Sequence, residues 1–251
     1  MSQVSSAALI IGASSGVGRA LAEQLAKKGY KLLLVARQER DLSALANHLN
    51  QTTSGKVSYL SLDLSNWNEE KSQRLFERAE NSLGDVSRLF LISGANSESD
   101  QFPLSSRTLS SLFEVNALAP IHIANQITTE HKKWKLKSIT VCSSIAAPVP
   151  RSRNIAYATA KAALESFVTG CRHYLSSQNI PFQIYRLGYV DTNLSFGQKL
   201  LFPAISPENV AQVLIKKSDK DLGIVYLPFY WRFIILVLKA LPWTIYKKLS
   251  F

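Results

Sequence analysis

The sequence is poor in cysteine and in long apolar runs. Among its 251 residues there are two cysteines, Cys142 and Cys171, which are too few for a disulfide framework and lack the spacing of metal ligands. We therefore expect two buried thiols, a reducing compartment and no metal site. The apolar content of 46% is that of an ordinary globular protein. These features exclude a disordered, a collagen-like and a polytopic membrane protein.

A secretory signal and an interdomain linker are also missing. The segment 1–8 has no basic residue, whereas a secretory signal begins with basic residues ahead of an apolar run. We interpret residues 7–11 as a buried strand and expect a cytoplasmic protein. No stretch rich in proline, glycine and serine divides the chain. The sequence therefore predicts one domain over residues 1–227, followed by an appendage over 228–251 that is not a separate domain.

Acidic residues are scarce relative to basic ones. Lysine and arginine total 29 against 18 for aspartate and glutamate, a net charge of +11. Such a charge attracts nucleic acid, an anionic membrane surface or a phosphorylated small molecule. Two segments concentrate it: residues 131–137 and the acid-free residues 222–251 carry four lysines or arginines each. We expect no nucleic acid partner, because no recognised binding module accompanies the charge.

Short apolar runs alternate with helical patterns along the chain. Strands are predicted at 7–11, 31–36, 57–62, 88–92, 138–142, 181–187 and 224–227. Helices are predicted at 17–28, 41–49, 68–82, 108–134 with a break near Pro120, 156–177, and from 206 onward. This alternation predicts an α/β fold, a doubly wound parallel sheet of about seven strands with helices on both faces.

A glycine-rich turn lies between the first strand and the first helix. Residues 12–18 read Gly-Ala-Ser-Ser-Gly-Val-Gly, a variant of the dinucleotide fingerprint. Glycine permits positive φ and a close approach of the backbone to a pyrophosphate, and the helix N-terminus beyond offers free N–H groups. The turn therefore predicts a nucleotide cofactor.

The second strand ends without an acidic residue. An NAD site usually has one there, about 20 residues past the glycines, for the ribose 2′-hydroxyl. Here Ala36 is followed by Arg37, and Arg40 is close by. Because a guanidinium can hold a 2′-phosphate through charge-assisted hydrogen bonds, we expect NADP(H) rather than NAD(H).

A tyrosine and a lysine, Tyr157 and Lys161, are spaced by one helical turn. A neighbouring cation lowers the pKa of a phenol, and a phenol tuned in this way can exchange a proton with a carbonyl or alcohol oxygen. Ser144 follows the fifth strand, where its hydroxyl could hold the same oxygen.

With these motifs the sequence resembles the short-chain dehydrogenase/reductase family over about residues 7–227, in its compact branch. The resemblance implies a Rossmann-type fold and a homodimer or homotetramer. The catalytic residues that it implies are Asn116, Ser144, Tyr157 and Lys161. The cofactor-binding residues that it implies are Gly12, Ser14, Ser15, Gly16, Val17, Gly18, Arg37, Asp63, Leu64, Ala95, Tyr157, Lys161, Val190 and Thr192.

The resemblance also implies the role of each catalytic residue. Hydride would pass to or from the nicotinamide C4, with Tyr157 as the general acid or base. Lys161 would lower the Tyr157 pKa and bind the nicotinamide ribose. Ser144 would orient the substrate oxygen, and Asn116 would extend a water-linked proton relay.

Three positions depart from the family pattern. Ile11 replaces the usual threonine before the first glycine, Ser93-Gly94-Ala95-Asn96 replaces Asn-Asn-Ala-Gly, and Leu187 replaces a proline. A threonine–asparagine contact between adjacent strands is therefore absent. The centre of the sheet is then either loosened or repacked with an apolar residue against a polar one.

Two segments bear on the substrate and the partners. Phe196, Leu200, Leu201, Phe202 and Pro203, with Phe102 and Pro103 opposite, suggest a hydrophobic cap over a lipid-like substrate. Residues 229–241 would form about 20 Å of helix, which is too short for a bilayer core of about 30 Å. This tail is interpreted either as an interfacial helix at a membrane surface or as a substrate lid or dimer contact.

Two functions remain open on the sequence. The first is an NADP(H)-dependent carbonyl reductase or alcohol dehydrogenase with a hydrophobic substrate. The second is a catalytically silent NADP-binding protein that uses its tail as a membrane anchor or partner surface. The complete Asn–Ser–Tyr–Lys set favours the first.

Overall fold

The computed structural model describes residues 6–192 and 202–249 of the chain. Its centre is a seven-stranded parallel sheet with the strand order β3-β2-β1-β4-β5-β6-β7. Each strand forms where an apolar run was predicted. The strands are β1 (Ala7–Ile11), β2 (Lys31–Ala36), β3 (Val57–Ser61), β4 (Arg88–Leu91), β5 (Ser138–Ser144), β6 (Phe182–Leu187) and β7 (Ile224–Leu227).

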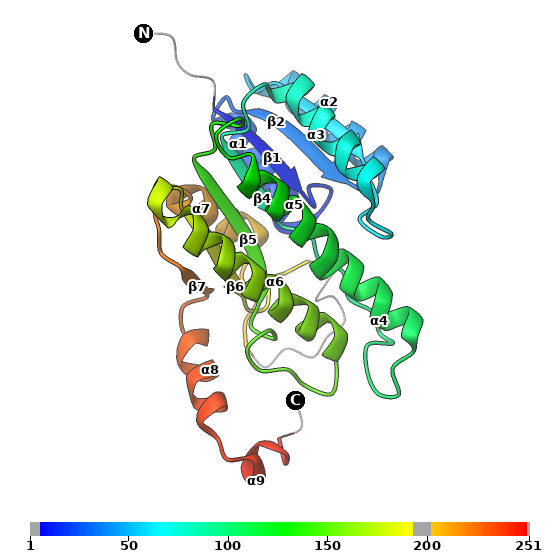
Figure 1. Cartoon of the computed structure of the whole chain (residues 1–251), viewed down its shortest axis with the longest axis vertical. Coiled ribbons are helices and arrows are strands. Elements are labelled where there is room, and N and C mark those ends of the chain that lie inside the picture. Colours follow the sequence, from blue (N-terminus) through cyan, green and yellow to red (C-terminus); the bar gives the residue numbers. More distant parts are fainter. Residues whose placement is uncertain (1–5, 193–201, 250–251) are drawn as a thin grey trace.

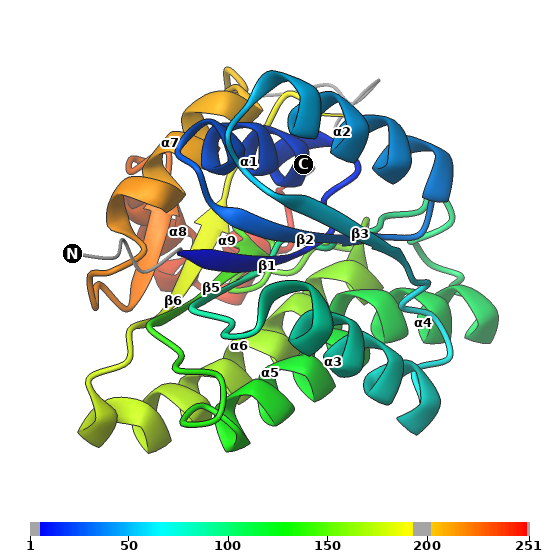
Figure 2. The same cartoon turned by 90° about the horizontal axis from the view of Figure 1, so that it is seen from above.

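Helices cover both faces of this sheet, as Figure 2 shows from above. One layer contains α1 (Gly16–Lys27), α2 (Glu39–Thr52) and α7 (Pro207–Lys217). The other contains α3 (Glu69–Leu83), α4 (Ser106–Phe113), α5 (Ala119–Thr129) and α6 (Ile155–Leu175). Each layer packs on its own apolar core, because both faces of the strands are buried. The doubly wound α/β fold is therefore confirmed.

The predicted helix over 108–134 is wrong in its bounds. A five-residue π-helix, Glu114–Leu118, separates α4 from α5. Pro120 stands in the first turn of α5, where a missing N–H is tolerated. The fifth strand also differs from the prediction, since Ser144 is its last residue rather than a residue beyond it.

The chain reverses its winding direction between β1 and β4. β1 pairs with β2 on one side and with β4 on the other, so the connections on the two sides of β1 run in opposite directions. In an open α/β sheet, ligands bind beyond the carboxyl ends of the strands at such a point. All seven strands are parallel, so the turn after β1, Arg37 after β2 and Ser144 at the end of β5 meet at one edge.

The departure at Ile11 places a buried apolar residue at the sheet centre. Ile11 is fully buried in one of the two cores, and its carbonyl accepts a hydrogen bond from Ile92 N at 2.9 Å. The neighbouring Ser93 is buried too, and its hydroxyl has no hydrogen-bond partner among the described residues. An apolar side chain therefore stands beside a polar one at this position.

Two of the four lysines in the basic segment 131–137 pair with carboxylates. Lys133 Nζ lies 3.2 Å from Glu80 Oε2, and Lys135 Nζ lies 2.8 Å from Asp85 Oδ2. The segment precedes β5, so it lies at the amino ends of the strands, away from the glycine turn. Trp134 is buried and anchors it to the core.

The C-terminal tail forms two helices, α8 (Trp231–Ala240) and α9 (Trp243–Tyr246). Figure 1 shows both beyond the β7 end of the sheet, at the end of the molecule away from the N-terminus. Trp231 and Ile235 of α8 pack on Ile145 and Val149 in a third apolar cluster. No helix in the described ranges has the length and apolarity needed to cross a membrane.

Candidate active site

The backbone of the glycine turn packs closely against itself and against the segment after β4. Gly12 has a φ of +94°, and a Cβ there would lie 2.7 Å from Ser93 N at the end of β4. A Cβ on Gly18 would lie 2.0 Å from the carbonyl oxygen of Gly12. Side chains are therefore excluded, and the N-terminus of α1 remains open to a ligand. Ser15, the N-cap, makes no side-chain capping hydrogen bond, so the first N–H groups of α1 have no competitor from that side chain.

The neighbouring strands place the other predicted nucleotide contacts beside this turn. Arg37 is exposed directly after β2, and its carbonyl accepts a hydrogen bond from Ser61 Oγ at 3.0 Å. Asp63 and Leu64 follow β3, the next strand outward. No carboxylate at positions 36–38 competes with the guanidinium of Arg37. The residues present therefore fit a nucleotide that carries a ribose 2′-phosphate.

Ser144, Tyr157 and Lys161 come together at the carboxyl end of β5. The hydroxyl of Ser144 lies near enough to Tyr157 to lower its pKa, and Lys161 Nζ lies 5.9 Å from the centre of the Tyr157 ring. Lys161 is 2% exposed. Its ammonium group donates to the carbonyls of Ser93, at 2.9 Å, and Cys142, at 3.3 Å. An ammonium group has three donors, so one remains for a ligand hydroxyl.

Burial shifts the pKa values of this group. It raises the pKa of Tyr157 to about 12, with the Ser144 hydroxyl acting in the opposite direction. The same effect lowers the pKa of Lys161 to about 8. Burial outweighs the effect of Ser144, so the net shift of the Tyr157 pKa is upward, and the expected lowering by Lys161 stays a prediction. The phenol stays protonated at neutral pH, which is the form that a general acid needs.

Asn116 lies in the π-helix between α4 and α5 and is fully buried. Its Oδ1 accepts from Ala95 N at 3.0 Å, and its Nδ2 donates to the carbonyls of Ala95 and Leu112, each at 2.9 Å. These hydrogen bonds hold the segment after β4 against the π-helix. A Cβ on Gly94 would lie 3.6 Å from Asn116 Oδ1 and 3.8 Å from Lys161 Nζ. All four predicted catalytic residues are thus brought together, and the water relay through Asn116 stays a prediction.

Asp100 is a site residue that the sequence analysis missed. It is 2% exposed, and its carboxylate accepts from Ala156 N at 2.8 Å and from Tyr157 N at 2.9 Å. The N-cap residue of α6, Asn154, makes no capping hydrogen bond of its own. Asp100 therefore caps this helix from a distant loop and holds the backbone of Tyr157. No local pattern reveals this, because 56 residues separate the partners.

A buried ion pair behind the site was also missed. Glu165, one turn beyond Lys161 on α6, accepts from Arg186 Nε at 3.0 Å and from Nη2 at 2.6 Å. Arg186 also donates to the hydroxyl of Tyr226. These three side chains join α6 to β6 and β7. The carboxylate of Glu165 also raises the pKa of Lys161, but the opposite effect of burial is larger. The i+4 spacing from Lys161 to Glu165 was the available sequence signal.

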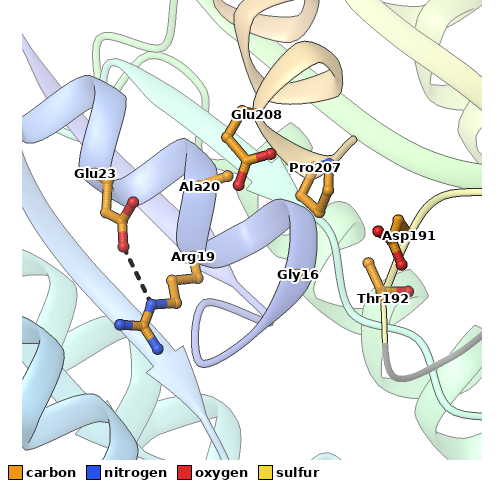
Figure 3. A pocket seen from close by; sticks show the side chains of 8 residues that line it. All are labelled: Gly16, Arg19, Ala20, Glu23, Asp191, Thr192, Pro207 and Glu208. Carbon is orange, nitrogen blue, oxygen red and sulfur yellow. Dashed lines mark hydrogen bonds and ion pairs between the residues drawn. The ribbon is translucent and has the colours of Figure 1, made fainter. Parts of the chain in front are cut away.

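The segment after β6 lies against the start of α1. A Cβ on Gly16 would lie 2.8 Å from Thr192 Cγ2, and Val190 is buried. Figure 3 shows the pocket of about 250 Å³ that Gly16 and Thr192 line together with Asp191 and the ends of α1 and α7. Glu23 and Glu208 also line it, and Arg19 Nε forms an ion pair with Glu23 Oε1 at 3.1 Å. Three carboxylates make this pocket a poor place for a phosphate, which fits better over the glycine turn.

An aromatic wall of Tyr189, Phe202 and Trp231 lies beyond the carboxyl ends of β6 and β7. The rings of Phe202 and Trp231 are centred 5.1 Å apart, and those of Tyr189 and Trp231 are 5.5 Å apart. Phe102, expected opposite, is 70% exposed. Phe196, Leu200 and Leu201, named as part of the substrate cap, lie outside the described residues.

Sequence relatives of this chain include reductases and dehydrogenases. It is 28% identical over 229 residues to a hydroxysteroid 11-beta-dehydrogenase 1-like protein of Xenopus tropicalis, which covers 89% of this chain and 79% of that protein. It is 25% identical over 233 residues to a very-long-chain 3-oxoacyl-CoA reductase of Podospora anserina, 89% of this chain and 67% of that protein.

Solved structures show the same fold. An alcohol dehydrogenase from Thermococcus sibiricus complexed with 5-hydroxy-NADP has a TM-score of 0.76 at 25% identity, covering 88% of this chain and 95% of that one. A short-chain dehydrogenase from Sphingobium yanoikuyae in complex with NADPH has a TM-score of 0.80 at 20% identity, covering 98% and 96%. The family model described as short chain dehydrogenase matches residues 6–199, and with the four catalytic positions gathered beside the glycine turn, this chain belongs to the short-chain dehydrogenase/reductase family.

Proposed function

We propose that this oxidoreductase transfers hydride between NADP(H) and the carbonyl or alcohol group of a hydrophobic substrate. The observation that carries the proposal is the meeting of Ser144, Tyr157 and Lys161 at the strand edge that also holds the glycine turn. When bound, the nicotinamide supplies or accepts the hydride. A substrate oxygen held between Ser144 and Tyr157 would lie within reach of the phenol proton.

Three features support NADP(H) as the cofactor. Arg37 is exposed at the end of β2 without an acidic neighbour before it. Lys161 keeps one donor for a ribose hydroxyl. The two solved structures named above contain NADPH or a hydroxylated NADP. Phosphate groups would lie over Gly12, Gly16 and Gly18, where no side chain blocks the N-terminus of α1.

The proton step belongs to Tyr157. For carbonyl reduction, its neutral phenol donates a hydrogen bond to the substrate oxygen and then gives up the proton as charge develops there. Lys161, held by the carbonyls of Ser93 and Cys142, stabilises the phenolate that forms. Ser144 donates a second hydrogen bond to the same oxygen. The raised pKa of Tyr157 fits the reducing direction.

The aromatic wall supports a hydrophobic substrate. Tyr189, Phe202 and Trp231 pack together beyond the carboxyl ends of β6 and β7. Relatives of this chain are named for a very-long-chain 3-oxoacyl-CoA and for a hydroxysteroid, both of which have large apolar parts. A medium- or long-chain ketone, or an apolar ring ketone, fits these features.

The deciding experiment measures oxidation of NADPH and of NADH by the full chain against a panel of short, long-chain and cyclic ketones and aldehydes. We expect turnover with NADPH and a preference for the larger apolar substrates. An equal rate or a preference for NADH would refute the cofactor assignment. Tight NADPH binding with no turnover on any substrate would instead favour the catalytically silent protein.

A further inference from the structure

Helix α8 is apolar on two opposite sides. Its inner side packs on the protein and consists of Trp231, Ile234, Ile235 and Leu238. Its outer side, which follows the same helical spacing half a turn away, consists of Phe233, Leu236, Val237 and Ala240. The exposed fractions of Phe233, Leu236 and Val237 are 60%, 67% and 60%. A helix that is apolar all round is normally covered on all sides.

Two further exposed aromatic residues flank α8 in the chain. Phe229, before α8, is 74% exposed, and Trp243, at the start of α9, is 70% exposed. We call the exposed residues Phe229, Phe233, Leu236, Val237 and Trp243 the outer tail face. Exposed apolar side chains concentrated in one segment mark an interaction site, whereas single exposed apolar residues do not.

Cations accompany the outer tail face. Arg232 and Lys239 are seven positions apart and lie along one border of it, and Lys247 and Lys248 follow α9. Residues 222–251 contain no aspartate or glutamate. In the described ranges no ion pair involves these four cations, unlike Lys133 and Lys135 of the other basic segment.

We propose that the outer tail face docks on the surface of an anionic lipid bilayer. A ten-residue helix measures about 15 Å, so α8 would lie in the interface with its apolar side among the acyl chains. Arg232 and Lys239 at its border can extend their charged ends to the phosphates. A second copy of the chain fits less well, because a two-fold contact through this face would bring two unneutralised sets of cations together.

The helix is already held in the position that docking needs. A Cβ on Gly188 would lie 2.1 Å from Trp231 Nε1, so glycine at this position lets α8 approach β6 closely. The hydroxyl of Tyr246 in α9 donates to the carbonyl of Pro150 at 2.8 Å. Because α8 is ordered against the protein by these contacts, binding would not have to fold it first.

Docking in this way would bring the active site to the lipid surface. Ile145, which contacts the inner side of α8, directly follows Ser144. Apolar substrates could then enter from the acyl phase rather than from water. This consequence rests on the proposed function, but the docking itself does not, so failure of one is distinguishable from failure of the other.

The first experiment is flotation of the full chain with vesicles of phosphatidylcholine and phosphatidylglycerol. We expect binding, and at least a ten-fold lower partition coefficient for the variant Leu236→Asn/Val237→Asn. The matched control is Leu222→Asn/Tyr174→Ser, which replaces exposed apolar side chains before β7 and at the end of α6, at the amino ends of the strands, and should bind like the wild type. All these side chains are exposed, and circular dichroism checks that each variant folds.

The second experiment separates charge from apolar burial. Lys239→Glu should weaken binding to anionic vesicles several-fold and leave binding to pure phosphatidylcholine vesicles unchanged, since the charge acts on the headgroup field. Lys216→Glu on α7 is the control and should change neither. Added salt should weaken the anionic preference.

Two results would overturn the proposal. One is a full chain that floats with neither kind of vesicle. The other is a dimer by analytical ultracentrifugation that dissociates in Leu236→Asn/Val237→Asn while vesicle binding is absent or unaltered, which would assign the face to a second copy.

Discussion

At the scale of single residues, the phenol of Tyr157 has the most demanding role. It is the proposed proton donor, and general acid–base catalysis contributes typically 10²–10⁴-fold to a rate. Tyr157→Phe should therefore lower kcat by about 100-fold or more while the Kd for NADPH changes little. Tyr174→Phe, at the far end of the same helix, is the control for a lost hydroxyl. Near wild-type turnover in Tyr157→Phe would remove the assigned role.

Arg37 is the residue on which the cofactor preference depends. A hydrogen bond to a charged group contributes about 1.5–3 kcal/mol, so Arg37→Ser should raise the Kd for NADPH by about 10- to 100-fold. The Kd for NADH should stay nearly constant, because NADH lacks the 2′-phosphate. Titration of nucleotide fluorescence measures both, with Arg74→Ser on α3 as the exposed control. An equal loss for both nucleotides would speak against a 2′-phosphate contact.

Lys161 gives the stability of the protein a pH dependence of defined sign. Burial lowers its pKa from 10.5 to about 8, so above pH 8 the folded chain releases a proton that the unfolded chain still binds. Stability then rises with pH in this range, by about 1 kcal/mol between about pH 8 and about pH 9. Urea unfolding at the two pH values measures it, and Lys161→Met should lack the rise.

Four other groups with a pKa raised by burial, Cys142, Tyr157, Cys171 and Tyr185, set an upper limit to this pH range. Burial raises the pKa of Cys142 and of Tyr157 to about 12 each. Acids with a raised pKa lose stability as pH increases past their unfolded values, which opposes the effect of Lys161. A wild type that loses stability over the same interval, relative to Lys161→Met, would contradict the assigned shift.

At the scale of elements, α6 is the helix that positions the chemistry. Asp100 caps its N-terminus with hydrogen bonds to Ala156 N and Tyr157 N. Asp100→Ala should reduce the free energy of unfolding by about 2 kcal/mol and lower kcat with little change in the Kd for NADPH. Urea unfolding and steady-state kinetics measure the two effects.

The matched control for this cap is Asn68→Ala. Asn68 caps α3 with a hydrogen bond from Lys71 N at 2.9 Å, outside the active site. It should cost about 1 kcal/mol of stability without changing kcat. If Asp100→Ala also left kcat unchanged, the carboxylate would stabilise the helix without positioning Tyr157.

At the scale of the whole molecule, the pair Glu165–Arg186 joins one helix layer to the sheet. The side chains are 8% and 16% exposed. Removing one partner of a buried pair leaves an uncompensated charge, so Glu165→Ala should cost about 3–5 kcal/mol. The double variant Glu165→Leu/Arg186→Met should recover most of this loss, because the buried charge is removed as well.

An exposed pair serves as the comparison. Arg172 and Asp221 lie 2.8 Å apart, but the aspartate is 64% exposed. Asp221→Ala should cost less than about 1 kcal/mol, since water screens such a pair. Chemical denaturation of the variants at one pH ranks these costs. A similar small loss for Glu165→Ala would show that water reaches the inner pair.

The folded molecule also shows how the positive charges that make up the net charge of +11 are distributed. In one basic segment Glu80 and Asp85 pair with two of the four lysines, and Arg37 stands where a 2′-phosphate would be bound. The tail keeps its four cations beside exposed apolar side chains. The two basic segments therefore differ in whether carboxylates lie next to their cations, which the composition alone does not reveal.

The sequence by itself determined most of the fold and predicted the four candidate catalytic positions. Runs of four to seven residues rich in apolar side chains predicted all seven strands, because the central strands of a parallel sheet are buried on both faces. The glycine turn and the Tyr157–Lys161 spacing were recognisable because their geometry is local, within one loop or one helical turn. Ser144 and Asn116 were identified through the family pattern, and the sheet order then brought them to the same edge.

Tertiary structure alone decided what depends on contacts between distant segments. The cap of α6 by Asp100, the Glu165–Arg186–Tyr226 group and the docking of Trp231 on Gly188 join residues far apart in the chain. The direction of the Tyr157 pKa shift was likewise inaccessible, since it depends on how much water the folded chain removes from the phenol. Local spacing specifies which groups can meet within an element, whereas burial and long-range pairing exist only once the layers have packed.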